Sequence, residues 1–294
     1  MRYRIVVNPA AGRGLAARRW PEVAAELARL GVEFEAHFTT GPGDATQVAQ
    51  RAAAEGFSAV VSAGGDGTLT EVVNGLAGTG LPLGVLPLGS GNDFARTAGL
   101  GLDPVLAARA LAHPARWPID LGRAEGRWFI NVASAGLDAE IARTMAEDLR
   151  FLRGTAAYVC ATLKCLARLK PAPVVLELDG VAHALDAVLV AVANGRFYGG
   201  GMMITPEARL DDGFFDVCVL GALGRLEFLE AFPRVFRGSH VTHPKISLYR
   251  ARSVRLRPAG PEPFLAQADG ELIGRLPQEF VVEPAALTLL GGGG

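Results

Sequence analysis

"SAGGDGTLTEVVNGL", residues 62–76, places three glycines and an aspartate between an apolar run and a stretch with helical spacing. Glycine in an ordered segment costs about 0.5–1 kcal/mol relative to alanine, so a cluster indicates an unusual backbone path or a close neighbour. Two interpretations fit these residues equally well. One is a tight turn from a strand into a helix, and the other is a turn whose exposed amides bind phosphate.

The residues that follow this turn predict the start of a helix. Thr68 and Glu71 have the spacing of a capping box, so Thr68 is the expected N-cap. Gly64, Gly65 and Gly67 would then carry unpaired backbone N–H groups, and a helix N-terminus with accessible amides favours anions. The stretch lacks the Gly-Lys-Ser/Thr of a Walker A loop and the glycine spacing of the dinucleotide fingerprint.

Two further glycine-rich turns favour the phosphate interpretation. "VNPAAGRG" (7–14) ends the first expected strand, and "PLGSGNDFAR" (87–96) ends another. The C-terminal ends of parallel strands meet at one edge of a sheet, where open α/β sheets bind ligands. Asp66 and Asp93 lie within two of these turns, and carboxylates beside phosphate repel it unless Mg²⁺ stands between them. The pair therefore indicates a metal–nucleotide complex, although either aspartate alone would indicate an Asx-turn or a helix cap.

The composition excludes several classes of protein. The 294 residues are half hydrophobic, with 37 glycines and 18 prolines, which is typical of a compact α/β or mixed protein with many turns. A formal net charge of −1 argues against nucleic-acid binding. The sequence contains no run of about 18 apolar residues, so we expect no membrane span. The N-terminus enters a strand without the apolar core of a signal peptide. Cys160, Cys165 and Cys218 are expected to be reduced, mostly buried thiols of a cytoplasmic protein.

The pattern of elements changes near residues 122–126. Strands and helices alternate before this point, which predicts a parallel sheet covered on both faces. After it come one strand at 127–136, a helical region at about 138–170, and runs of strand type with antiparallel turn signals. We expect an α/β domain at 1–124 and a mainly antiparallel β-sandwich domain at 125–278, and the last strand, about 279–290, is free to return to the first domain.

Five motifs occur in order along the chain: "GGDGTLTEVVNGL", "PLGSGNDFAR", "DLGRAEGRWFINVASAGLD", "PEARLDDGFFDV" and "ADGE". This set resembles the bacterial soluble lipid kinases with a diacylglycerol kinase catalytic domain, relatives of sphingosine kinases and, more distantly, of NAD kinases. The resemblance covers nearly the whole chain. GGDGT alone is shared with NAD kinases, so the specificity lies in the set of five.

The resemblance implies that the first domain binds ATP as co-substrate, together with Mg²⁺. A hydroxyl residue after the second strand contacts the nucleotide, which is best matched by Thr39, with Thr40 as the alternative. Ser90 stands where many relatives carry threonine, and it keeps the hydroxyl. The residues implied for ATP and its Mg²⁺ are Thr39, Gly64, Gly65, Asp66, Gly67, Thr68, Leu69, Thr70, Ser90, Asn92, Asp93 and Asp120.

The resemblance also assigns catalysis to the "ADGE" motif. Asp269 is implied as the general base, with Glu271 in support, because phosphoryl transfer to an alcohol needs a carboxylate that accepts the hydroxyl proton. Without the family, an Asp-Gly pair favours a type I′ hairpin turn. Both interpretations can hold, since a hairpin tip can present a base to a cleft.

In "PEARLDDGFFDV" (206–217) the resemblance implies a structural Mg²⁺ site. Its ligands are the carboxylate of Asp212 and the backbone carbonyls of Arg209 and Phe214, an oxygen set that suits a hard cation. The alternative is an ordinary Asp-Gly turn between strands.

The second domain is expected to bind a lipid acceptor that is met at the membrane surface, so the protein would be peripheral at the inner membrane face. Two basic amphipathic stretches, 149–170 and 223–240, are candidates for lipid contact, or they are core helices with a solvated face. "NGRFYGGGMMITP" (194–206) fits either an adaptable cleft wall or a sheet core. The alternative functions are phosphorylation of a soluble nucleotide, as in NAD kinases, and nucleotide binding without turnover. The lipid acceptor and a homodimeric assembly are left open.

Overall fold

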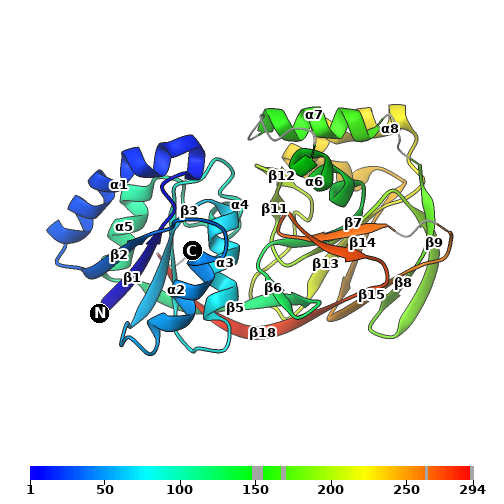
Figure 1. The fold of residues 1–294 in the computed structure, drawn as a ribbon. Coiled ribbons are helices and arrows are strands. Elements are labelled where there is room, and N and C mark those ends of the chain that lie inside the picture. Colours follow the sequence, from blue (N-terminus) through cyan, green and yellow to red (C-terminus); the bar gives the residue numbers. More distant parts are fainter. Residues whose placement is uncertain (148–154, 167–169, 262–263, 292–294) are drawn as a thin grey trace. The chain divides into compact units, whose positions relative to one another are not determined.

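The computed structural model describes residues 1–147, 155–166, 170–261 and 264–291, and the chain divides into two compact units (Figure 1). Unit 1 contains Met1–Leu121 together with the segment from Pro284 onward, and unit 2 contains Gly122–Glu283. The last strand, β18 (Gln278–Gly291), therefore contributes residues to both units.

Unit 1 is built on four parallel strands: β1 (Arg2–Val7), β2 (Glu33–Phe38), β3 (Ala59–Gly64) and β4 (Leu83–Pro87). Their order is β2-β1-β3-β4, and the end of β18 adds in parallel beside β4. β3 and β4 are buried along their whole length, which explains why both are continuous apolar runs in the sequence.

Five helices accompany this sheet: α1 (Ala11–Arg29), α2 (Asp44–Ala52), α3 (Asp66–Leu76), α4 (Asp93–Thr97) and α5 (Pro104–Ala112). α1 and α5 pack on the face formed by Tyr3, Ile5 and Val7 of β1. α2 and α3 contact each other and lie on the other side of the strands (Figure 1). The predicted parallel sheet with helices on both faces is confirmed.

β18 also pairs with β5 (Ala115–Ala124), the strand in which the first segment of unit 1 ends. The carboxylate of Asp120 accepts a hydrogen bond from the backbone N–H of Ala285 at 2.8 Å. Asp120 is only 3% exposed, so this bond lies in the interior and fixes the returning strand.

Unit 2 contains two packed antiparallel sheets. The first has the order β14-β13-β10-β7-β16-β17, and in the second β15 lies between β8 and β18, with β9 beyond β8. The strands are β6 (Arg127–Phe129), β7 (Val132–Gly136), β8 (Ala172–Leu178), β9 (Val181–Ala187), β10 (Leu189–Ala193), β11 (Phe197–Tyr198), β12 (Met202–Met203), β13 (Phe215–Leu220), β14 (Ile246–Ala251), β15 (Ser253–Pro258), β16 (Leu265–Ala268) and β17 (Glu271–Arg275).

One apolar cluster joins the two sheets of unit 2. The ring of Phe129 stacks on Phe215 with centroids 5.5 Å apart and meets Phe280 edge-on at 6.3 Å. All three rings are fully buried, and residues of both sheets pack around them. The predicted β-sandwich is therefore confirmed.

On the other face of the sheet, residues of β7, β10 and β13 form a second apolar cluster with the helices that cover them. These are α6 (Leu137–Glu147), α7 (Thr155–Leu166), α8 (Arg225–Ala231) and the 3₁₀ helices η1 (Phe232–Arg237) and η2 (Ser239–Thr242). The predicted helical region thus contains α6 and α7, while its residues 148–154 and 167–169 lie outside the described residues. Within the described part of the chain, no helix has the length and apolar character needed to span a bilayer.

Three local predictions were wrong. Thr68 is not an N-cap, because helix α3 begins two residues earlier and its N-cap is Gly65 in an extended conformation. The strand expected at 127–136 is broken at Ile130 and Asn131 into β6 and β7. Cys218 is buried as expected and Cys165 is half-buried, but Cys160 is exposed.

Candidate functional site

The three glycine-rich turns of unit 1 meet at one edge of the parallel sheet. A Cβ atom on Gly89 would lie 2.3 Å from the Cα of Gly65, so these two backbones touch directly. A Cβ on Gly12 would lie 2.7 Å from the carbonyl oxygen of Leu88. These glycines are therefore required for the close approach of the turns, and the predicted gathering at the C-terminal ends of β1, β3 and β4 is confirmed.

Asp66 links the second turn to the third. Its carboxylate accepts the backbone N–H of Phe94 at 3.2 Å, at the beginning of α4. Burial raises the pKa of Asp66 above its usual range, and the backbone amides of Phe94, Asp93 and Asn92 act in the opposite direction. Asp93, on the same short helix, is 4% exposed. The carboxylate of Asp66 thus lies at the start of the helix that carries Asp93, the second residue predicted for the magnesium network.

The predicted phosphate-binding segment is only partly accessible. Gly65 and Asp66 are half-buried and Gly67 is exposed, whereas Gly64, Thr68, Leu69 and Thr70 are buried. Thr68 Oγ1 accepts a hydrogen bond from Asn8 Nδ2 at 2.9 Å, and Thr70 donates to the carbonyl of Asp66 at 3.1 Å. The structure therefore leaves the backbone of residues 65–67 as the surface that an anion can reach. Asn8 is a site residue that sequence reasoning missed, although it ends the first strand directly before a glycine turn.

Thr39, Ser90 and Asn92 flank the same edge in different ways. Thr39 follows β2, and its N–H donates to Val7 at 2.9 Å. The alternative Thr40 is engaged elsewhere, since both its N–H and its hydroxyl donate to Asp44. Ser90 is exposed. Asn92 has a φ of 55° and exchanges two hydrogen bonds with Gly89, which shapes the third turn.

In unit 2, Asp269 lies at the tip of the hairpin between β16 and β17. Its carboxylate accepts the backbone N–H groups of Ile130, Asn131 and Val132 at 2.8, 3.0 and 3.0 Å. The carboxylate thus satisfies the backbone N–H groups at the break between β6 and β7, and the bonds hold the hairpin against β7. Glu271 is exposed and forms an ion pair with Arg127 at 2.7 Å.

The carboxylate of Asp212, in the loop before β13, is occupied by groups of the chain. It accepts the N–H of Phe214 at 3.1 Å and forms an ion pair with Arg250. Burial raises the pKa of the neighbouring Asp216 to about 6, with Asp212 and Glu207 adding to the shift and Arg250 opposing it. The described residues contain no cluster of three or more His, Cys, Asp or Glu side chains arranged for a metal.

A small apolar cavity of about 40 Å³ lies inside unit 2, among α6, α8, η1 and the β11–β12 segment; we call it the acceptor cavity, after the role proposed for it below. Tyr198, Met202 and Ile204 line it, and the same three residues pack in the apolar core of unit 2, so residues 194–206 fit both of the interpretations given for them. Phe228 and Phe232 line it as well, which places this pair of the 223–240 stretch in the interior.

Three buried polar residues that the structure describes line the acceptor cavity and were missed by sequence reasoning: Asp138, Thr162 and His240. Asp138 is 6% exposed and accepts the hydroxyl of Tyr198 at 3.1 Å. His240 donates through Nε2 to the carbonyl of Ile204 at 3.1 Å, and its Nδ1 has no hydrogen-bond partner within the described residues. Burial lowers the pKa of His240, so its ring is neutral at pH 7. A charge directly after the apolar strand "NVASAGL" was the available sequence signal for Asp138.

Comparison with known proteins agrees with this geometry. Residues 2–124 match the family described as "Diacylglycerol kinase catalytic domain", and residues 131–291 match the "YegS C-terminal NAD kinase beta sandwich-like domain". A relative named diacylglycerol kinase from Bacillus subtilis (strain 168) is 35% identical over 95% of this chain and 93% of its own length. The chain belongs to the diacylglycerol kinase family.

Other members of the diacylglycerol kinase family are similarly close. A relative of that name from Mycobacterium tuberculosis (strain ATCC 25618 / H37Rv) is 35% identical over 97% of this chain and 93% of its own length. A crystal structure of a protein described as a diacylglycerol kinase of Bacillus anthracis str. Sterne superimposes with a TM-score of 0.82, at 26% identity, covering 98% of this chain and 94% of that one. The fold and the family resemblance deduced from the motifs are thus confirmed.

Proposed function

We propose that this chain transfers the γ-phosphoryl group of ATP to a hydroxyl group of diacylglycerol or a closely related lipid. The observation that carries the proposal is that two glycine turns meet through Gly65 and Gly89 beside the N-terminus of α3, where Gly67 is exposed, in a chain that belongs to the diacylglycerol kinase family. In the reaction, the lipid oxygen forms a bond to the γ-phosphorus, the bond to the β-phosphate oxygen breaks, and ADP leaves.

The phosphates of ATP are proposed to bind the backbone of residues 65–67. The helix α3 begins there, so its first N–H groups and its dipole favour negative charge, and the missing side chains let phosphate oxygens approach. Thr39 and Ser90 supply hydroxyl contacts at the same edge. We assign Asp120 a supporting place in the carboxylate network, through its bond to Ala285.

The carboxylates of Asp66 and Asp93 fit Mg²⁺, because a hard cation takes oxygen ligands and both groups lie inside the turns beside the proposed phosphate site. Bound there, Mg²⁺ would offset the negative charge of the phosphates. Burial raises the pKa of Asp66, and a cation bound beside it would oppose this shift by favouring the ionised carboxylate.

A second cation site is proposed at the loop of Asp212, with the carbonyls of Arg209 and Phe214. In the structure the guanidinium of Arg250 supplies the positive charge at this carboxylate, so a metal would have to displace it. Burial raises the pKa of the nearby Asp216 to about 6, Arg250 opposes the shift, and the carboxylates of Asp212 and Glu207 add to it. We expect Mg²⁺ to raise the melting temperature of the wild type and not of Asp212→Asn, and equal shifts would exclude the site.

The acceptor cavity is proposed to receive an acyl chain of the lipid. Its lining is apolar and includes Met202, a side chain that adapts its shape easily, so a volume of about 40 Å³ can widen around a chain. The buried carboxylate of Asp138 and the neutral Nδ1 of His240 can accept hydrogen bonds from lipid hydroxyl groups. Asp269, with Glu271 in support, is proposed to accept the proton of the reacting hydroxyl.

The lipid is proposed to be met at a membrane surface by way of α8 and η1. Leu226, Leu229 and Phe236 are 82%, 45% and 40% exposed, and Arg225 and Arg237 lie in the same segment. Exposed apolar side chains bordered by arginine suit the headgroup region of an anionic membrane. We expect Leu226→Glu to reduce co-flotation with anionic vesicles, and unchanged flotation would exclude this surface.

The test of the function is transfer of label from γ-labelled ATP to diacylglycerol in mixed micelles. We expect lipid-dependent labelling that falls at least about 10²-fold in Asp66→Ala and in Asp269→Ala, the size of a general-base contribution. NAD⁺ without lipid is the control acceptor for the alternative nucleotide kinase. Labelling of NAD⁺ instead of lipid, or ATP binding without any transfer, would refute the lipid kinase function.

A further inference from the structure

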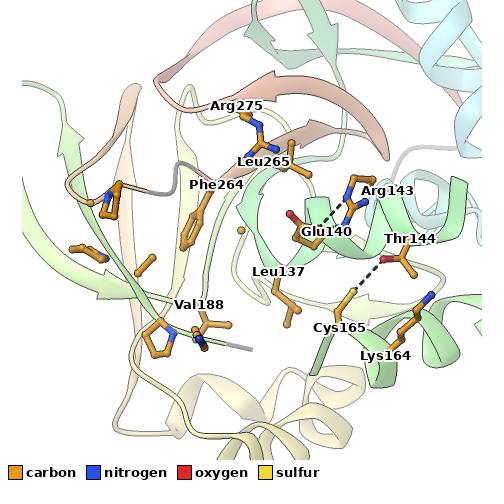
Figure 2. Close-up of a pocket in the computed structure, with 17 residues that line it drawn as sticks. Leu137, Glu140, Arg143, Thr144, Lys164, Cys165, Val188, Phe264, Leu265 and Arg275 are labelled. Atoms are coloured by element: carbon orange, nitrogen blue, oxygen red, sulfur yellow. Dashed lines mark hydrogen bonds and ion pairs between the residues drawn. The ribbon is translucent and has the colours of Figure 1, made fainter. Parts of the chain in front are cut away.

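Unit 2 contains a second cavity, of about 950 Å³, between helices α6 and α7 and the segments that lead into β8 and β16 (Figure 2). We call it the basic cavity. Of the lining residues in the described part of the chain, it shares one, Leu137, with the acceptor cavity. Nothing in the proposed phosphoryl transfer uses this space. A volume near 1,000 Å³ is at the upper end of the range for small-molecule sites.

One part of the lining of the basic cavity is apolar. Leu137 comes from α6, Val188 precedes β10, and Phe264 and Leu265 lie at the start of β16. In Figure 2, Val188 and Phe264 lie on one side of the open space, and the labelled residues of α6 and α7 lie on the other. Three prolines, Pro171, Pro173 and Pro261, complete the apolar part. Such a wall can bury hydrocarbon.

The other part of the lining is basic. Arg143 on α6, Lys164 on α7, Lys170 before β8 and Arg275 on β17 all contribute. Among the lining residues that the structure describes, Glu140 is the one acidic side chain; its carboxylate is bound to Arg143 at 2.8 Å, and Arg143 also pairs with Glu147 at 2.9 Å. Both lysines are exposed, so their ammonium groups lie at the mouth. The lining therefore carries an excess of positive charge beside an apolar wall.

The acceptor cavity has the opposite polarity. Within the described lining, its ionisable side chains are the carboxylate of Asp138, the phenol of Tyr198 and the neutral ring of His240. A neutral lipid with hydroxyl groups suits that site, whereas the basic cavity favours a ligand with negative charge. Two cavities in one domain thus differ in the headgroup that they favour.

We propose that the basic cavity binds an anionic lipid, with an acyl chain against Leu137, Val188 and Phe264 and an acidic headgroup at Lys164 and Lys170. This site is additional to the acceptor cavity and is independent of phosphoryl transfer, so it is tested without ATP. An anionic lipid bound there would hold α6 and α7 against the strands of unit 2.

Cys165 provides a reporter inside the basic cavity. It lines the cavity, and its sulfur lies 3.4 Å from the hydroxyl oxygen of Thr144. Cys160, on the same helix, is exposed and does not line the cavity, so it serves as the internal reference. The rate of alkylation of each thiol in the full chain is followed by mass spectrometry.

Three probes separate the sources of binding: monomeric dihexanoyl phosphatidylglycerol, dihexanoyl phosphatidylcholine with the same chains, and inorganic phosphate. We expect phosphatidylglycerol alone to slow alkylation of Cys165, with Cys160 unchanged. In the double variant Lys164→Glu/Lys170→Glu the concentration needed for protection should rise at least about tenfold, because each surface charge contributes appreciably to binding an anionic headgroup. Arg18→Glu/Arg51→Glu, with the same charge change at exposed positions of unit 1, should bind like the wild type.

Ala172→Trp fills the cavity without changing charge and should abolish protection, and its melting temperature reports whether it has folded. If Ala172→Trp is unfolded, the double variant Lys164→Glu/Lys170→Glu still tests the proposal. Equal protection by phosphatidylcholine, protection by phosphate alone, no protection by any probe, or equal loss of protection in the arginine control would each overturn the proposal.

Discussion

Two hairpin turns of unit 2 are built on the same dipeptide. Asp179-Gly180 joins β8 to β9, and Asp269-Gly270 joins β16 to β17. The φ angles are 47° and 88° in the first turn and 46° and 87° in the second, as in a type I′ turn. Each aspartate donates its N–H to a carbonyl of a neighbouring strand at 3.0 Å, Asp179 to Ser253 and Asp269 to Val132.

The carboxylates of these two turns also have similar roles. Asp179 accepts the N–H groups of Arg252 and Ser253, at the junction of β14 and β15, while Asp269 accepts three, at the junction of β6 and β7. The backbone contacts of Asp269 are therefore those of a turn that is fixed to its neighbour. Its geometry alone does not distinguish it from Asp179, and the assignment as a base depends on the family motif. The following experiments test that distinction.

The largest difference in lipid phosphorylation is expected between Asp269→Ala and Asp179→Ala. Both variants should lose about 1–3 kcal/mol of unfolding free energy, because backbone N–H groups lose a charged acceptor. Only Asp269→Ala should lower lipid phosphorylation, by at least about 10²-fold. Urea unfolding and initial rates measure the two effects. Asp269→Asn keeps an oxygen for Asn131 and Val132, so its activity should fall equally with less loss of stability. If it retains wild-type turnover, Asp269 is a structural residue like Asp179.

Gly180→Ala and Gly270→Ala test whether the two turns are energetically equivalent. A Cβ atom meets nothing within 4 Å at either position, so the penalty comes from the left-handed backbone alone. Each variant should lose about 1–2 kcal/mol. Chemical denaturation of both variants checks this. If the two losses of unfolding free energy differ by more than about 1 kcal/mol, the two turns are not energetically equivalent.

Asp66 is the contrasting case, because its Asp-Gly pair begins a helix. Burial raises the pKa of Asp66 in the folded state, so between the unfolded and folded pKa values the folded chain binds more protons. The unfolding free energy should then fall as the pH rises above about 4. Asp66→Asn removes this contribution, so its stability relative to the wild type should increase from pH 4 to pH 7. A constant or decreasing difference in thermal or urea unfolding would contradict the raised pKa.

The smallest effect on stability is expected at Glu271. Its ion pair with Arg127 is about half exposed on both sides, so Glu271→Gln should change the unfolding free energy by less than about 0.5 kcal/mol. Turnover should fall less than in Asp269→Asn. A larger loss of turnover in Glu271→Gln, with Arg127→Gln as the control for the ion pair, would identify Glu271 as the proton acceptor.

Much of unit 1 could be predicted from the sequence because its pattern is local. Apolar runs such as β3 and β4 mark buried parallel strands, and glycine turns mark their C-terminal ends. The Asp-Gly pair before Glu271 likewise predicted a type I′ hairpin. In each case a few adjacent residues carry the information.

The features that sequence reasoning missed depend on contacts between distant residues. Thr68 has the spacing of an N-cap, yet its hydroxyl is bound to Asn8, 60 positions away. The break at Ile130 follows from its bond to Asp269, 139 positions away. Asp138 and His240 become neighbours of one cavity only through the topology of the sheet. No short window of sequence contains these pairs.

The course of β18 has a consequence for biosynthesis. Leu289 pairs with Leu83 of β4, and Ala285 is bound to Asp120, 165 positions earlier in the chain. All of unit 2 up to Glu283 is translated between these partners. The first unit to leave the ribosome is thus the last to be completed, and until then the edge of β4 stays open to other strands.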